Sequence, residues 1–506
     1  MNLHKRIPQI CVLALFVCLE PLVVDAEVSV PNIFGDSMVL QQKQQNKVWG
    51  RANPGEKVAV SIAGSSQETE ADGDGDWSVL LDPLSAGGPH ELVISSSNQI
   101  TLNDVLVGEV WICSGQSNMQ WRVDSTNDAD LVRATAAYPK LRMISYPNKG
   151  SQEPIWTHDA SNWMVCSPAT VGKFSAVGYF FGRELSQSIK VPIGLINNSW
   201  GGSAADAWID RPLLEANADY QLTLKNWQAE EQQYEMLSTK TERSEQEEKQ
   251  LSNLRRRLSG NQRPANIYNG VLRSHLGYGI RGAIWYQGES NASRAYQYRY
   301  LFPMMIANWR DQWNQREFPF YWVQLADFRD EQGEPSESAW AELREAQTMT
   351  MSKLPNTGEA VIIDVGEGKD IHPRNKLTVG QRLARWALAK QYGADLACQS
   401  PTYKSMERAA GKIILTFEHV SGGWRPFDVK NPIGFAIAGD DKQFVWAEAK
   451  VIDGTQIEVS SSTISDPVAV RYAWADNPVC NMFSGVGLPL TPFRTDDWPG
   501  VTVDEH

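Results

Sequence analysis

The amino-acid sequence predicts an α/β protein with a mainly parallel sheet, flanked by an N-terminal and a C-terminal β module. Three observations indicate this architecture. Short alternating runs separated by turn residues occupy residues 27–107. Apolar strand-like runs then alternate with long helical patterns over residues 108–397, which is typical of a parallel sheet covered by helices. Alternating patterns return over residues 398–506.

The first 26 residues read as a signal peptide. Lys5 and Arg6 precede an apolar run from Ile10 to Leu19, and small residues follow before Glu27. No later stretch approaches the roughly 20 apolar residues that a membrane helix needs, so no membrane span is predicted. We therefore expect a periplasmic or extracellular protein that is soluble after signal cleavage.

Residues 27–107 read as a β-sandwich-like module. The run Lys57–Ile62 alternates polar and apolar side chains, and Asn53-Pro54-Gly55 marks a turn before it.

Residues 108–397 carry four strand-like runs, at residues 110–113, 193–196, 282–286 and 361–364. Between about residues 222 and 260 the chain is almost entirely polar and charged, which predicts a helical insertion exposed to solvent. This insertion could also serve as a lid or a subunit contact. Residues 398–506 form the second β module, expected to complete the catalytic unit.

Composition excludes some classes of protein. Lys and Arg number 47 against 60 Asp and Glu, a formal net charge of -13, and the longest basic run is Arg255–Arg257. A nucleic-acid partner is therefore not expected. The 19 tryptophans supply flat aromatic faces of the kind that stack on sugar rings.

The cysteines do not predict a metal site. Four of them follow the signal peptide, at Cys113, Cys166, Cys398 and Cys480, without metal-ligand spacing. Disulfides and buried thiols both remain open, and no metal or cofactor is expected.

A candidate nucleophile follows the first strand of the central part. In Gly115-Gln116-Ser117, the glycine allows a tight turn at the carboxyl end of the strand, where α/β proteins place their ligands. The helix that follows would offer free backbone N–H groups to an oxyanion. The alternative is a serine that only caps a helix.

A candidate base lies at the same edge of the predicted sheet. His372 follows the run ending at Asp364, precedes a helical segment, and has Asp370 two residues before it. Imidazole is the usual base for a serine hydroxyl near neutral pH.

Several motifs together resemble the sialate O-acetylesterase family of SGNH-type hydrolases. They are Gly115-Gln116-Ser117-Asn118-Met119, Trp285-Tyr286-Gln287-Gly288-Glu289-Ser290-Asn291 and Asp370-Ile371-His372-Pro373, with further similarity at Trp200-Gly201-Gly202-Ser203 and in the C-terminal tail. The resemblance implies a flavodoxin-like core that cleaves acetyl esters on sugars without a metal.

The resemblance assigns roles to individual residues. It makes Ser117 the nucleophile and His372 the base. SGNH-type enzymes usually carry an aspartate three residues before the histidine, but Lys369 stands there in this chain. Asp370 is therefore the favoured partner of His372, and Glu289 is the competing candidate.

The resemblance also implies an oxyanion hole. It would combine the backbone N–H of Ser117, that of Gly202 or Gly201, and the side-chain amide of Gln287 or Asn291. An uncharged donor stabilises a developing negative charge without protonating it.

The expected function is an exported serine esterase that removes O-acetyl groups from carbohydrates through an acyl-enzyme on Ser117. O-acetylated sialic acids are the first choice of substrate and acetyl xylan or another polysaccharide is the alternative. A non-catalytic carbohydrate-binding surface protein is the alternative of another class. A sialic acid carboxylate would pair well with an arginine, and Arg344 and Arg382 lie near the motifs. The acetylated sugar, the disulfide pairing and the oligomeric state stay open.

Overall fold

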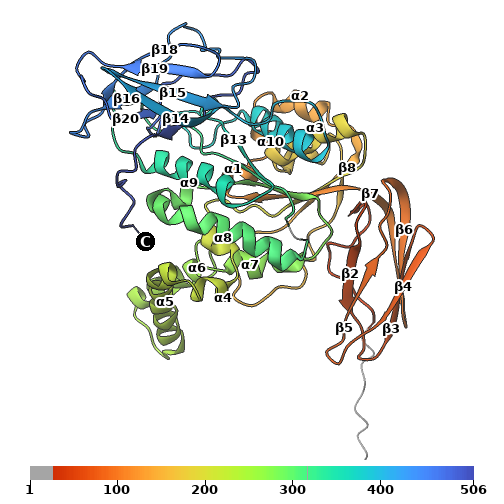
Figure 1. Cartoon of the computed structure of the whole chain (residues 1–506). Helices are drawn as coiled ribbons and strands as arrows, with labels where there is room; N and C mark the ends of the chain where they lie inside the picture. The colour runs from red at the N-terminus through yellow and green to blue at the C-terminus, as the bar shows by residue number, and fades with distance from the viewer. Residues whose placement is uncertain (1–26, 316, 506) are drawn as a thin grey trace, which may run out of the picture.

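The computed structural model describes residues 27–315 and 317–505. The predicted signal peptide, residues 1–26, lies outside the described residues. Figure 1 shows a red β module at one end of the chain, a central α/β body and a blue β module on the opposite side.

The N-terminal β module is built mainly from antiparallel strand pairs. Strand β2 pairs with β5, while β3 pairs with β4 and β6. Burial alternates in β5, where Trp77, Val79 and Leu81 are buried and the residues between them are exposed. The strands are β1 Val39–Gln41, β2 Asn46–Arg51, β3 Lys57–Ile62, β4 Ser65–Glu70, β5 Asp76–Leu81 and β6 Gly87–Ser95.

Strand β7 joins this module to the central body. It runs for 17 residues, Gln99–Gly115. Its first half pairs with β6 and with β1, and its second half pairs with β10 and β11 of the central sheet. The expected boundary at residues 107/108 therefore falls inside one continuous strand.

The central sheet has the strand order β13-β12-β11-β7-β10-β8-β9. Neighbours along this path pair in parallel except β8 and β9, which are antiparallel. With the antiparallel strands of the N-terminal module, the whole eleven-stranded sheet is mixed. The prediction thus holds for an α/β protein, with a mixed sheet in place of a mainly parallel one. The further strands are β8 Tyr138–Ser145, β9 Met164–Cys166, β10 Ile193–Asn197, β11 Gly282–Tyr286, β12 Phe320–Val323 and β13 Thr357–Ala360.

One predicted strand lies a few residues too late. The apolar run at residues 361–364 follows β13 and is not itself a strand. Strand β12, which pairs with β13, ends at Val323, opposite Ala360. Residues 361–364 therefore have no residue of β12 to pair with.

Helices cover both faces of the central sheet (Figure 1). Helices α3, Ala176–Ile189, and α10, Lys376–Gln391, pack on one face, and α8, Ala295–Trp313, and α9, Ala339–Lys353, lie on the other. Successive side chains of a strand point to opposite faces of the sheet, so each central strand contributes to the cores on both faces. In β11, Ile284 and Tyr286 join the core with α3 and α10, whereas Ala283 and Trp285 join the core with α8. The shorter helices are α1 Ser117–Gln120, α2 Ala129–Ala134, α4 Arg211–Glu215 and α7 Asn266–Gly270.

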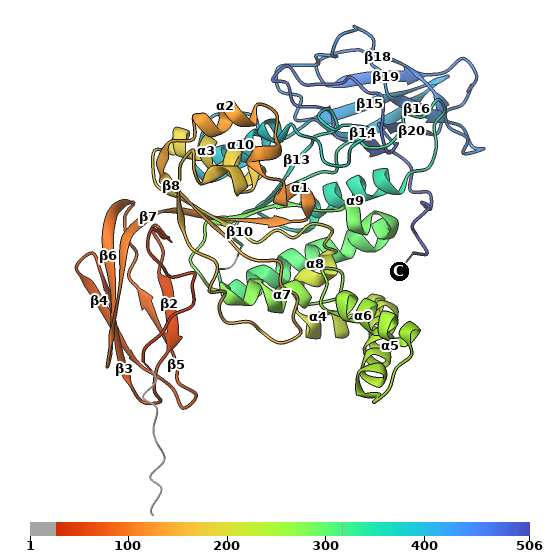
Figure 2. The same ribbon diagram turned by 180° about the vertical axis from the view of Figure 1, so that it is seen from behind.

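The charged segment forms two helices, α5 Gln221–Thr239 and α6 Glu245–Leu258, which project from the body (Figure 2). They share a small core made by Leu237, Leu251 and Leu254. Ser244 and Glu247 form a capping box that fixes the start of α6.

The C-terminal module consists of two four-stranded sheets, β14-β15-β19-β18 and β17-β16-β20-β21, packed around one apolar core. It is bonded to the central body, since Arg344 of α9 donates to the carbonyl oxygen of Ala475 at 2.7 Å. The strands are β14 Thr402–Ala409, β15 Lys412–Glu418, β16 Phe435–Ala438, β17 Val445–Trp446, β18 Glu448–Val451, β19 Gln456–Ser460, β20 Ala469–Tyr472 and β21 Phe493–Arg494.

The structure answers the question that the sequence left open about the cysteines. Cys113, Cys166, Cys398 and Cys480 are all free thiols. Over residues 27–315 and 317–505, no helix is long and apolar enough to cross a membrane.

Candidate active site

The turn after β7 exposes Ser117 at the carboxyl edge of the sheet. Gly115 ends the strand with φ at 131°, and a Cβ atom there would lie 2.1 Å from the carbonyl oxygen of Tyr286, so only glycine fits. The N–H of Gln116 donates to that same carbonyl at 2.9 Å. Gln116 is the N-cap of α1 and Ser117 is its first residue. A role for Ser117 as a helix cap is therefore excluded.

His372 meets Ser117 across the edge of the sheet. Its Nε2 atom lies 2.8 Å from Oγ of Ser117, a hydrogen-bond distance. The Trp121 ring stacks on the imidazole, with ring centroids 5.2 Å apart and 15° between the planes. Burial lowers the pKa of His372, and the charge of Lys376 lowers it further, while Asp370 acts in the opposite direction. The neutral imidazole, which can accept the serine proton, is thus favoured.

The two candidate carboxylates have different surroundings. Oδ1 of Asp370 lies 3.5 Å from Nδ1 of His372 and accepts the backbone N–H of His372 at 2.9 Å. Glu289 is instead bonded to Asn118, whose Nδ2 donates to Oε1 at 2.7 Å, and burial raises its pKa. Within the described part of the chain, no hydrogen bond or ion pair joins Glu289 to His372. The imidazole therefore has Asp370 beside it.

Asn118 and Lys376 form a buried layer under the serine, and the sequence analysis missed both. Nζ of Lys376 donates to Oδ1 of Asn118 at 2.5 Å, and the amide nitrogen of Asn118 also reaches the carbonyl oxygen of Ile371 at 3.0 Å. Burial lowers the pKa of Lys376 to about 7. A lysine at the start of a helix carries no sequence signal for this contact, whereas Asn118 could have been considered because it follows Ser117.

The backbone donors near Ser117 differ in availability. The N–H of Gly201 donates to Oε1 of Gln120 at 2.9 Å, so it already has a partner. The N–H groups of Ser117 and Gly202 have no partner within the described residues. A methyl group on Gly201 would lie 3.4 Å from Cβ of Ser117, which places this glycine turn in contact with the candidate nucleophile.

The side-chain amides expected in the oxyanion hole are bonded elsewhere. Nε2 of Gln287 donates to the carbonyl oxygen of Ser203 at 3.1 Å and to Oδ1 of Asn291 at 2.7 Å. Nδ2 of Asn291 donates to Asp206 at 3.1 Å. Both residues belong to a buried polar network, so neither amide nitrogen lacks a protein partner. Gln116 was missed by the sequence analysis, and its amide nitrogen makes no hydrogen bond within the described part of the chain.

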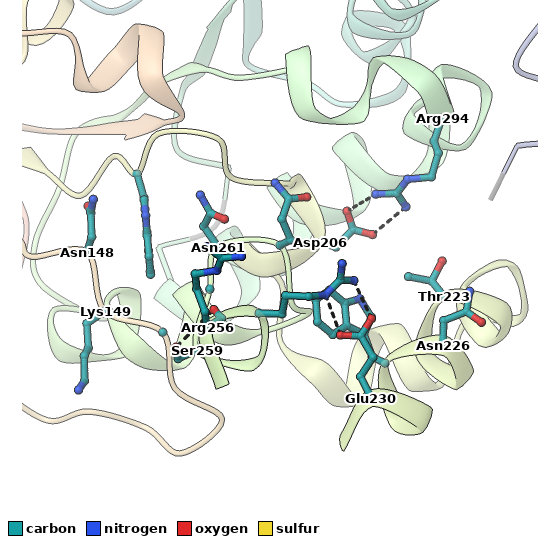
Figure 3. Close-up of a pocket in the computed structure, with 16 residues that line it drawn as sticks. Asn148, Lys149, Asp206, Thr223, Asn226, Glu230, Arg256, Ser259, Asn261 and Arg294 are labelled. Carbon is teal, nitrogen blue, oxygen red and sulfur yellow. Dashed lines mark hydrogen bonds and ion pairs between the residues drawn. The ribbon is translucent and has the colours of Figure 1, made fainter. Parts of the chain in front are cut away.

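A pocket of about 950 Å³ opens beside the glycine turn (Figure 3). One wall comes from Asn148, Lys149 and Trp200, and the other from helices α5 and α6 and the residues after them. Asn148 accepts a hydrogen bond from the Gln120 side chain at 3.1 Å, which ties this wall to α1.

The two arginines near the motifs are not placed to meet a substrate. Arg344 is fully buried and donates to the backbone carbonyls of Leu325, Ala326, Ala475 and Asp476. Arg382 forms a two-point ion pair with Asp364, at 2.5 and 2.7 Å. Their roles are structural.

Comparison with known proteins gives consistent matches. A sequence model described as "Carbohydrate esterase, sialic acid-specific acetylesterase" matches residues 107–250 and 259–389. The sialate O-acetylesterase of Mus musculus is 31% identical, over 90% of this chain and 92% of its own length. The sialate O-acetylesterase of Homo sapiens is 29% identical, over 93% of both chains.

A solved structure is similar over nearly the whole chain. It is a carbohydrate acetylesterase from Xanthomonas citri, 38% identical, with a TM-score of 0.82 over 93% of this chain and 100% of that one.

Proposed function

The chain belongs to the sialic acid-specific acetylesterase family of carbohydrate esterases and is a carboxylic ester hydrolase, and we propose that it is an exported serine esterase acting through an acyl-enzyme on Ser117. Its preferred substrates are O-acetylated sialic acids. The observation that carries the mechanism is the 2.8 Å contact between Oγ of Ser117 and Nε2 of His372.

The proposed reaction has two steps. Oγ of Ser117 attacks the acetyl carbonyl carbon while Nε2 of His372 takes the serine proton, and the imidazolium then returns that proton to the departing sugar oxygen. In the second step His372 takes a proton from water, which attacks the acetyl-serine ester, and the imidazolium then returns that proton to Oγ of Ser117 as the acetyl group leaves as acetic acid. Asp370 orients the imidazole and stabilises its positive charge.

The negative charge that develops on the carbonyl oxygen needs nearby donors. The unpartnered N–H groups of Ser117 and Gly202 support a role as the oxyanion hole, and the amide of Gln116 is the candidate for a third donor. The loop of residues 200–206 is then held in place by the hydrogen bonds that Gly201, Gln287 and Asn291 make.

The choice of sialic acids follows the names of the relatives, two mammalian sialate O-acetylesterases. The Xanthomonas citri relative is described more broadly as a carbohydrate acetylesterase, so acetylated xylan is the substrate to assay beside sialic acids. The proposed export rests on the charged and apolar N-terminal pattern.

Replacing the nucleophile tests the mechanism. Ser117→Ala removes one hydroxyl, and we expect hydrolysis of acetyl esters to fall by about 10³-fold or more. Turnover of p-nitrophenyl acetate and of O-acetylated sialic acid is measured with circular dichroism as the control for folding. A folded variant that kept a tenth of the activity would exclude Ser117 as nucleophile.

A further inference from the structure

The pocket beside the glycine turn carries an excess of positive charge in an acidic protein. Its walls contain four cationic side chains, Lys149, Arg256, Arg257 and Arg294, against two carboxylates, Asp206 and Glu230. The chain as a whole has a formal net charge of -13. A local excess of cations in such a chain indicates an anionic ligand.

Two of the cations are neutralised within the pocket wall. Arg257 forms a two-point ion pair with Glu230, at 2.6 and 2.8 Å, and its guanidinium lies 5.6 Å from the Trp227 ring centroid. Arg294 pairs with Asp206 at 3.1 Å. Figure 3 shows both pairs as dashed contacts.

The remaining two cations have no carboxylate partner within the described residues. Arg256 makes one long hydrogen bond of 3.4 Å, to the side chain of Asn253. Lys149 makes no side-chain hydrogen bond or ion pair there. Arg256 belongs to α6 and is one of the residues that line the pocket (Figure 3). Its planar guanidinium is suited to a carboxylate, which it can bind through two parallel hydrogen bonds.

The other lining groups are suited to a sugar. Trp200 and Trp227 offer aromatic faces, and Asn226, Asn261 and Gln262 offer amides that can bond to hydroxyl groups. The volume of about 950 Å³ lies at the upper end of the range of roughly 300–1,000 Å³ for small-ligand sites. The pocket thus has room for more than one sugar ring.

The pocket adjoins the glycine turn beside the candidate nucleophile, although neither Ser117 nor His372 is among the residues that line it. Trp200 precedes Gly201, where an added Cβ atom would lie 3.4 Å from Cβ of Ser117. Asn261, just beyond α6, donates to the carbonyl oxygen of Gly201 at 2.5 Å, and Gln262 donates to that of Gly202. A sugar seated between α6 and Trp200 therefore lies next to the turn that holds the candidate oxyanion donors.

We propose that this pocket binds a sugar carrying a carboxylate and that Arg256 is the specificity-determining residue that pairs with it. The inference rests on the proposed esterase function, which it extends by giving the helical insertion a role in substrate choice. Arg256 lies within residues 251–258, which the family model leaves unmatched. The family resemblance by itself therefore assigns it no role. Two sources share this chemistry, sialic acids and uronic acids of plant polysaccharides.

The test compares Arg256→Gln with Arg255→Gln. Both variants remove one positive charge from α6, but Arg255 does not line the pocket. Each is assayed on O-acetylated sialic acid, on the methyl ester of that sugar, on acetylated galacturonan oligomers, on acetylated xylan oligomers and on p-nitrophenyl acetate. The methyl ester removes the ligand's charge and keeps its shape.

We expect Arg256→Gln to lower kcat/KM by about tenfold on at least one of the two acidic sugars, mainly through KM, because a charged hydrogen bond is lost. The acidic sugar that is affected identifies the source of the ligand. Values for xylan oligomers and p-nitrophenyl acetate should stay within about twofold of the unmodified protein, and Arg255→Gln should change none of them. If sialic acid is the source, its methyl ester should give the same low kcat/KM with the unmodified protein and with Arg256→Gln, because the ligand no longer carries the charge that Arg256 binds.

Two results would overturn the inference. One is that Arg256→Gln changes kcat/KM equally, or not at all, for acidic and neutral substrates. The other is that the unmodified protein hydrolyses neither of the two acidic sugars. Only activity that is lost in Ser117→Ala is counted in these assays. A failure of this inference is therefore distinguishable from a failure of the proposed serine mechanism, in which Ser117→Ala would stay active. Hydrolysis of p-nitrophenyl acetate by Arg256→Gln shows that the variant is folded and its nucleophile intact.

Discussion

At the scale of single residues, the two carboxylates near the nucleophile differ in what they contact. Asp370 is half exposed and lies beside the imidazole, while Glu289 is buried and bonded to Asn118. A carboxylate that stabilises an imidazolium must lie close to it, and of these two only Asp370 has an ion-pair contact with His372.

We predict that Asp370→Asn lowers kcat more than Glu289→Gln does. The amide keeps the size of the side chain and removes the charge, and in a well-known triad this change costs about 10⁴-fold. Turnover of acetyl esters is measured for both variants, with circular dichroism to confirm folding. If a folded Glu289→Gln were the more damaged, Glu289 would take the place of Asp370 in the triad.

The acidic limb of the pH profile of kcat/KM should move in opposite directions in the same two variants. Activity needs neutral His372 and is lost as the pH falls through its pKa. Asp370 raises that pKa, so Asp370→Asn should move the acidic limb of the profile to lower pH. Glu289 raises the pKa of Lys376, and without it Lys376 loses its proton more easily. An uncharged Lys376 no longer lowers the pKa of His372, so Glu289→Gln should move the limb to higher pH. Shifts in the same direction would contradict this coupling.

Sequence reasoning found Ser117 and His372 because each follows a strand-like run at the same edge of the sheet. It could not find the contact of Lys376 with Asn118, since this depends on how α10 packs beneath the turn. The family resemblance implied the amide of Gln287 or Asn291 as an oxyanion donor, and both amides are hydrogen-bonded in a buried network that includes Asp206.

At the scale of elements, the pair α3 and α10 positions the candidate base. A Cβ atom on Gly380 of α10 would lie 2.6 Å from Cβ of Phe180 and 2.9 Å from the backbone nitrogen of Phe181. The two helices are therefore in close contact at Gly380. Because α10 begins four residues after His372, its position determines where the imidazole lies.

We predict that Gly380→Ala destabilises the protein by about 1–3 kcal/mol, as expected for overpacking. Without the contact, alanine would favour the helix by about 1 kcal/mol, so the sign of the effect is diagnostic. Thermal or urea unfolding measures it, and Gln381→Ala, an exposed change in the same helix, is the matched control. A stabilised Gly380→Ala would show that the helices are not in close contact there.

The sequence located most elements by their periodicity, and its errors concern strand ends. The run at residues 361–364 is as apolar as a strand, but the end of β12 leaves it unpaired. An apolar pattern in the sequence predicts that a segment is buried, but it does not predict whether the segment pairs with a neighbouring strand.

At the scale of the whole molecule, β7 makes the N-terminal module and the central body one structural unit. The sequence suggested a boundary between residues 107 and 108, because short alternating runs give way there to strand-like runs separated by helical segments. Glu109 is in fact buried and paired with Arg281 at 2.6 Å and with Tyr392 at 3.0 Å, so the strand continues through it. These partners lie more than 170 residues away in the chain and could not be read from local pattern.

We predict that the N-terminal module and the central sheet unfold together. Buried side chains of both parts belong to one continuous apolar core, which includes Val28 of the module and Trp285 of the central sheet. Hydrogen exchange of β6 and β11 amides, followed by mass spectrometry at increasing urea, should show both losing protection over the same range. Earlier loss in β6, with β11 still protected, would show that the module unfolds independently.

The helical insertion has a further consequence for how this protein can be changed by mutation. Helices α5 and α6 pack on each other through their own leucines, whereas the candidate catalytic residues Ser117 and His372 lie at the sheet edge and in the β13–α10 loop. Substitutions on the exposed faces of α5 and α6 can therefore change the wall of the pocket without replacing a residue of the Ser117–His372 pair. Substrate preference and hydrolytic chemistry would then be separable by mutation, because they are carried by different elements of the chain.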